Sequence, residues 1–183
     1  IYQSDIVTIG TLIHQHRLHQ KLSQKILCQG ICSTSKLSKI ENGSLQPDVF
    51  LAEALLERLG FSSREFIFWG NAEEAKIHDL QNYLRLWYKW DMTQIQIPLQ
   101  NLRTIALNKN TPLLNQTILF AKAKYTTHIE EKIQLLEEAL ACTLPDFNIY
   151  QILQHRLTRN ELTILNTLAF SYLKVKISHQ SII

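Results

Sequence analysis

The 183-residue sequence is poor in residues that interrupt or cross-link a chain, with 5 glycines, 4 prolines and 3 cysteines. Because glycine and proline break helices, their scarcity beside abundant Leu, Ile, Gln, Lys and Glu favours helices over short strands. An odd set of cysteines (Cys28, Cys32 and Cys142) argues against a disulfide scaffold and for reduced thiols. The sequence also lacks a signal peptide and any run of 18 apolar residues. We therefore expect a cytoplasmic protein without a membrane partner.

Acidic residues are missing from the stretch between Ile6 and Ile40. The same stretch contains five basic residues, namely Arg17, Lys21, Lys25, Lys36 and Lys39. Its net charge is thus +5, and because the whole chain carries +3, the remainder carries −2. A basic segment in an otherwise slightly acidic chain is typical of a module that binds phosphate groups.

Apolar spacing and capping residues predict five short helices in the first 70 residues. The first spans 7–20, the second spans 24–29 behind Ser23, and the third spans 34–41 behind Ser33. Asn42 and Gly43 supply a left-handed stop to the third helix. Pro47 is placed in the first turn of a fourth helix that ends at Gly60, and Ser62 or Ser63 caps a fifth. A domain boundary is expected at Gly70 and Asn71.

Longer helices are predicted after this boundary, and short turns connect them. Their expected ranges are 72–90, 93–109, 112–126, 128–142, a short 147–155, and 159–176. Paired helices of this length suggest a helical-repeat solenoid, and Gln116 to Ala141 is the best candidate for one repeat. The chain begins at Ile1 without Met and ends at Ile183 directly after a helix. We therefore expect the solenoid to be truncated, as part of a longer protein.

The segment from Leu22 to Gly43 resembles the phage-repressor-type (Xre) helix-turn-helix family. Leu22-Ser-Gln matches the opening of that family's second helix, and Ser38-Lys-Ile-Glu-Asn-Gly43 matches the close of its third. Ile9-Gly10, Ile13 and Arg17 match upstream. The turn around Gly30 is one residue shorter than the common pattern, as in peptide-pheromone-responsive regulators of the PlcR and Rgg type. The DNA-binding match covers about 50 residues.

This resemblance implies an all-α fold, in which a lambda-repressor-like five-helix DNA-binding domain (1–70) precedes an antiparallel helix-pair, tetratricopeptide-like regulatory domain (71–183). It implies base contacts from the recognition helix, a phosphate contact by Gln24, and an ion pair between Arg17 and Glu41. The candidate DNA-binding residues are Gln24, Ser33, Thr34, Ser35, Lys36, Ser38 and Lys39. Small polar and basic side chains suit base edges and phosphates in a major groove, whereas Leu37 and Ile40 are expected to anchor the helix inward.

Each candidate also has a plainer interpretation. Polar residues on a short helix are often only solvated, and Lys21 and Lys25 could equally be solvated charges or phosphate contacts. Three histidines, His14, His16 and His19, could suggest a metal site, but their spacing does not place all of them on one helix face. Cys28 and Cys32 could suggest redox chemistry, although core packing is the better interpretation. We expect neither a metal nor a cofactor.

The regulatory part offers weaker candidates. Asn side chains can bond both groups of a peptide backbone, and the chain provides Asn82, Asn108, Asn115, Asn160 and Asn166. Each could equally be a surface or capping residue, so no peptide-binding residue is assigned. An aromatic group at Tyr83, Trp87, Tyr88 and Trp90 could be core, a ligand wall or a dimer seam. No catalytic constellation is present, which disfavours an enzyme.

Together these patterns predict a transcription regulator that binds double-stranded DNA as a homodimer, since two-fold symmetry doubles the contact of a single domain. The resemblance implies control by a small signalling peptide. An alternative is a regulator whose helical domain docks a protein partner.

Overall fold

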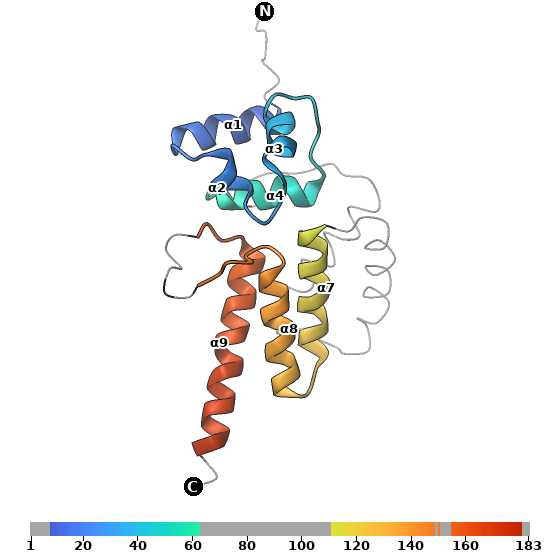
Figure 1. Cartoon of the computed structure of the whole chain (residues 1–183), viewed down its shortest axis with the longest axis vertical. Helices are drawn as coiled ribbons and strands as arrows, with labels where there is room; N and C mark the ends of the chain where they lie inside the picture. Colours follow the sequence, from blue (N-terminus) through green and yellow to red (C-terminus); the bar gives the residue numbers. More distant parts are fainter. Residues whose placement is uncertain (1–7, 63–110, 149, 151–154, 181–183) are drawn as a thin grey trace, which may run out of the picture.

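The computed structural model describes residues 8–62, 111–148, 150 and 155–180, and every element in these ranges is an α-helix. Four helices precede the first gap: α1 (Ile9–His19), α2 (Gln24–Cys28), α3 (Thr34–Glu41) and α4 (Val49–Arg58). Three follow it: α7 (Pro112–Tyr125), α8 (Ile129–Ala141) and α9 (Arg159–Gln180). The first four form the N-terminal cluster, and the last three form the C-terminal array, in which they run side by side (Figure 1). The expected all-α class is confirmed.

Side-chain caps set the starts of the short helices. Thr8, Ser23 and Ser33 each accept a hydrogen bond from the backbone N–H three residues later, which satisfies an otherwise unpaired donor. The prediction for the fourth helix was wrong in one respect. Pro47 lies before the helix, and Asp48 is its cap, because the Asp48 carboxylate accepts the N–H of Leu51 at 2.9 Å.

The core of the N-terminal cluster is built from the inward faces of all four helices. Ile13, Leu27, Leu37, Ile40 and Leu55 are fully or almost fully buried. Where α1 crosses α3, a methyl group on Gly10 would overlap the carbonyl oxygen of Ile40, so only glycine allows the two helices to lie this close. Leu113 of α7 belongs to the same core. The C-terminal array is therefore packed directly onto the N-terminal cluster.

A second core lies within the C-terminal array. Phe120 and Ala123 of α7 meet Leu136 and Leu140 of α8, and Ile164 of α9 closes the group. At other positions α9 exposes large apolar side chains, among them Leu162, Phe170, Leu173 and Ile177. Within the part of the chain that is described, no helix combines the length and the apolarity needed to cross a membrane.

Several predictions lie outside the described residues. These are the fifth helix, the boundary at Gly70 and Asn71, the helices 72–90 and 93–109, and the aromatic group with Asn82 and Asn108. The short helix expected at 147–155 falls largely outside them as well, and Phe147 and Asn148 at its start are not helical. The last helix continues to Gln180, four residues beyond the predicted end.

Candidate nucleic-acid interface

Helix α3 has one buried and one exposed side. Leu37, Ile40 and Glu41 are buried in the N-terminal cluster. The opposite side shows Thr34, Ser35, Ser38 and Lys39 to solvent, and Lys36 beside them is half-buried. This is the distribution that a helix needs in order to lay short polar and cationic side chains against a polar surface.

Ser33 occupies the start of α3 and fixes where that polar side begins. Its exposed hydroxyl oxygen accepts the backbone N–H of Lys36 at 3.1 Å. Because a serine hydroxyl can accept one bond and donate another, this role in capping does not exclude contact with a phosphate oxygen. Lys21 and Lys25 are both exposed on the same cluster.

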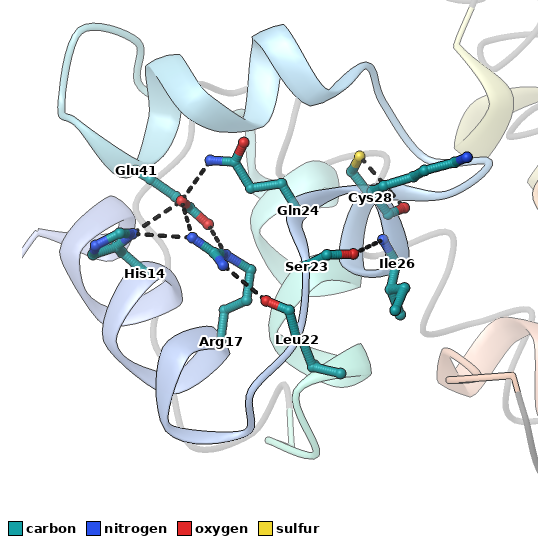
Figure 2. Close-up of polar contacts among 9 residues, drawn as sticks. His14, Arg17, Leu22, Ser23, Gln24, Ile26, Cys28 and Glu41 are labelled. Carbon is teal, nitrogen blue, oxygen red and sulfur yellow. Dashed lines mark hydrogen bonds and ion pairs between the residues drawn. The ribbon is translucent and has the colours of Figure 1, made fainter.

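A buried carboxylate lies behind the exposed side of α3. Glu41 receives two hydrogen bonds from Arg17, from Nε to Oε1 at 2.6 Å and from Nη2 to Oε2 at 2.8 Å (Figure 2). Arg17 also donates through Nη1 to the carbonyl oxygen of Leu22 at 2.8 Å. This guanidinium thus ties α1 to α3 and to the segment that enters α2.

Two further side chains complete the network around Glu41. The Nδ1 atom of His14 lies 3.0 Å from Oε2, and the Nε2 atom of Gln24 donates to the same oxygen at 2.8 Å (Figure 2). Burial alone would raise the pKa of Glu41, but the hydrogen bonds from Arg17, Gln24 and His14 outweigh it and lower this pKa to about 2. The bond to Glu41 in turn raises the pKa of Arg17. Glu41 is therefore ionised and internally neutralised at neutral pH.

Gln24 begins α2 as expected, and its side chain also has an internal partner. The resemblance implied a contact between its side chain and a phosphate, whereas one amide hydrogen is used on Glu41. The amide has a second hydrogen that an acceptor can use. The structure thus adds an internal role for Gln24, which sequence reasoning missed because the pairing spans 17 residues.

The cysteines of this region are protected rather than reactive. Cys28 is almost fully buried, and burial raises the pKa of its thiol. Burial likewise raises the pKa of Cys32 to about 11, and the nearby Cys28 adds to this shift. Since the thiolate is the reactive form, a raised pKa makes both thiols less reactive, which favours a role in core packing over redox chemistry.

The histidines do not converge. His14 contacts Glu41, whereas the ring of His16 packs edge-on against Phe61 with centroids 4.5 Å apart. In the described ranges no group of three His, Cys, Asp or Glu residues could hold a metal ion.

Sequence reasoning also missed a set of residues at the contact between the two parts of the molecule. Arg58 at the end of α4 and Glu161 in the first turn of α9 form a buried ion pair, with Nη2 and Oε1 3.1 Å apart. Thr158 and Glu161 have the Thr-x-x-Glu spacing of a capping box, a signal that was visible in the sequence. Arg58 carried no such signal.

Comparison with known proteins does not identify a family for this chain. No model of a protein family, no curated protein and no solved structure matches the chain.

Proposed function

We propose that this protein is a sequence-specific DNA-binding regulator, with α2 and α3 as a helix-turn-helix and α3 as its recognition helix. One observation carries the proposal. The exposed side of α3 presents Thr34, Ser35, Ser38 and Lys39 without an exposed acid on the helix, because its single carboxylate, Glu41, is buried on Arg17.

The charge distribution supports this role. A DNA groove is lined by phosphates, which repel exposed carboxylates on a protein surface that enters it. The carboxylate of Glu41 is paired with Arg17 inside the cluster, whereas on α3 Lys39 is exposed and Lys36 is half-buried. We infer that Thr34, Ser35 and Lys36 contact base edges, and that Ser33, Ser38 and Lys39, with Gln24, contact the backbone.

The test is selection of bound sequences from a random double-stranded DNA pool, followed by titration of the selected site. Wild type is expected to yield a palindrome, because a homodimer places two recognition helices about one helical turn apart. A Lys36→Ala substitution should cost about 1 to 3 kcal/mol in affinity and relax the preference at one position. Lys39→Ala should weaken binding to all DNA sequences alike. It should also reduce the slope of log affinity against log salt concentration by about one.

Lys176→Ala is the matched control, because Lys176 is an exposed lysine on α9, away from α3. It removes the same charge from the chain and should leave affinity almost unchanged. If no form of the chain binds DNA at low salt, or if Lys176→Ala matches Lys36→Ala, the recognition-helix assignment is wrong.

We infer that the C-terminal array regulates this binding as a tetratricopeptide-like helix-pair domain that responds to a small signalling peptide. The short connection between α7 and α8 and the side-by-side packing of α7, α8 and α9 support this architecture. The alternative, a docked protein partner, is favoured by the exposed apolar side chains of α9, such as Phe170 and Ile177. Titration with a peptide library and pull-down with a protein partner separate the two.

A further inference from the structure

The C-terminal array contacts the N-terminal cluster at the turn between α2 and α3. Gly30 lies in that turn with a φ of +70°, and a methyl group on it would overlap the carbonyl oxygen of Thr143. Thr143 is itself fully buried, and its hydroxyl accepts a hydrogen bond from Nε2 of Gln116 at 2.6 Å. The turn that sets the angle between α2 and α3 therefore lies directly against fixed backbone of the other part of the molecule.

Arg58 holds the same turn from the side of α4. Its side chain is almost completely buried, and Nη1 donates to the carbonyl oxygens of Leu27, at 3.2 Å, and of Gln29. These carbonyls belong to the last residues before Gly30, where α2 ends and its carbonyl groups need partners. A single guanidinium thus closes the end of α2.

Glu161 fixes that guanidinium to the C-terminal array. Its Oε1 accepts from Nη2 of Arg58 at 3.1 Å, and its Oε2 accepts the backbone N–H of Thr158 at 2.6 Å. The Thr158 hydroxyl accepts the N–H of Glu161 in return, at 3.3 Å. The carboxylate is therefore held at the start of α9, so α9, Glu161, Arg58 and the α2–α3 turn are joined in one continuous series of bonds.

A second contact prevents the two parts from rotating about this ion pair. Nη1 of Arg156 donates to Oε1 of Gln20 at 2.7 Å and to the carbonyl oxygen of Arg58 at 3.2 Å. Gln20 donates in turn to the carbonyl oxygen of Leu59 at 2.7 Å. Arg156 precedes α9, and its partners are Gln20 at the end of α1 and Arg58 at the end of α4. The joint consists of Gln20, Gly30, Arg58, Thr143, Arg156, Thr158 and Glu161.

We propose that Arg58 and Glu161 are positioning residues that couple the geometry of the α2–α3 turn to the position of α9. Removing one charge from a buried pair leaves the other uncompensated, so breaking the contact between Arg58 and Glu161 is costly. A ligand or partner that displaces α9 would therefore change how the turn holds α3. The effect on DNA affinity rests on the proposed function, whereas the coupling of α9 to the turn does not.

Amide hydrogen exchange of the whole chain tests the coupling without DNA. The reporters are the N–H groups of Ile31 and Cys32, which donate to the carbonyl oxygen of Cys28 at 2.9 and 3.0 Å. In Glu161→Gln the capping box survives, because glutamine also serves in it, but the charge that pairs with Arg58 is lost. We expect these amides to exchange about tenfold faster or more.

Glu138→Gln is the matched control, since Glu138 is exposed on α8 and loses the same charge. It should leave the exchange of both reporter amides unchanged. If Glu161→Gln does not fold, the double substitution Arg58→Met with Glu161→Met avoids an unpaired buried charge. Because it also removes the hydrogen bonds from Arg58 to the carbonyl oxygens of Leu27 and Gln29, it should accelerate exchange at the turn as well. Exchange within about twofold of wild type in the folded variant would overturn the proposal.

DNA titration then separates the two proposals. Lys36→Ala should weaken binding to the selected site while its turn exchanges like wild type, and Glu161→Gln should weaken DNA binding about fivefold together with faster exchange. If wild type binds no DNA, the proposed function fails but the exchange result still decides the coupling. If Glu161→Gln accelerates exchange and leaves DNA affinity unchanged, the turn is coupled to α9 but does not transmit to the recognition helix, and the regulatory part of the proposal is wrong.

Discussion

Two buried arginine–glutamate pairs in this molecule have the same chemistry and different positions. Arg17 and Glu41 are 24 residues apart and join helices of the N-terminal cluster through two parallel bonds. Arg58 and Glu161 are 103 residues apart and join the N-terminal cluster to the C-terminal array through a single bond. Glu41 accepts hydrogen bonds from further side chains. The second oxygen of Glu161 instead accepts the backbone N–H of Thr158, which directly precedes α9.

The two pairs suit different roles. A carboxylate with several side-chain donors keeps its charge under most conditions, and the low pKa of Glu41 shows this. Glu161 has a single side-chain donor, Arg58, besides the backbone N–H of Thr158. The first pair therefore suits permanent stabilisation of the surface that carries α3, and the second suits a contact that can be broken.

The largest effect is expected from Arg17→Met. This substitution leaves the buried Glu41 without its main partner, and the free energy of unfolding should fall by about 3 to 5 kcal/mol. Urea unfolding at neutral pH measures the loss. Lys25→Met, at an exposed lysine of the same cluster, is the control and should stay within about 0.5 kcal/mol of wild type. Equal effects of the two substitutions would show that the pair contributes nothing specific.

Gly30→Ala tests the contact between the two parts. The new methyl group would overlap the carbonyl oxygen of Thr143, and the alanine would have to keep a left-handed φ. We therefore expect a loss of about 3 kcal/mol in the free energy of unfolding. Gly43→Ala provides the comparison, because Gly43 also has a positive φ of +78° but nothing within 4 Å. It should cost only about 1 kcal/mol. A similar loss in both variants would exclude close packing of the turn against Thr143.

The third prediction concerns acid. Glu41 has a pKa lowered from 4.5 to about 2 in the folded chain. A lowered folded-state pKa contributes stability that is present above 4.5 and is lost as the pH falls towards 2, because the unfolded chain takes up the proton first. Unfolding measured across this range should show a loss of about 3 kcal/mol from this group. The variant Glu41→Gln should be less stable at neutral pH and should lack that part of the pH dependence.

The smallest effect is expected from Thr158→Ala, which removes the hydroxyl of the capping box but leaves the ion pair of Glu161. The free energy of unfolding should fall by about 1 kcal/mol. Thr163→Ala is the control, since the Thr163 hydroxyl bonds the carbonyl of Arg159 within the helix at 2.8 Å. Because alanine is the better helix former, that variant should be unchanged or slightly more stable.

The local features of the fold could be predicted because neighbouring residues determine them. Ser23 and Ser33 cap the helices that follow, and Gly43 takes a left-handed conformation after α3. The start of α4 was misplaced because proline in a first turn and aspartate at a cap are both favourable, and the two adjacent residues Pro47 and Asp48 offer both. The side-chain hydrogen bond of Asp48 decides the boundary.

The candidate site was predictable in part. The exposed residues of α3 follow from helical spacing once Leu37 and Ile40 are turned inward. The bond from Gln24 to Glu41 and the pair of Arg58 with Glu161 do not follow from spacing, because they depend on how helices cross in space. Arg58 is an ordinary last-turn arginine in the sequence, and only the packing of α9 gives it a buried partner.

The separation of Arg58 from Glu161 along the chain has a consequence for the order of folding. Contacts of the N-terminal cluster close short loops, whereas the joint requires the chain to bring together residues 103 positions apart. Interactions that form after the rate-limiting barrier change the unfolding rate more than the folding rate. Weakening the joint should therefore raise the unfolding rate and shorten the lifetime of the folded molecule. The rate at which the N-terminal cluster folds should stay the same.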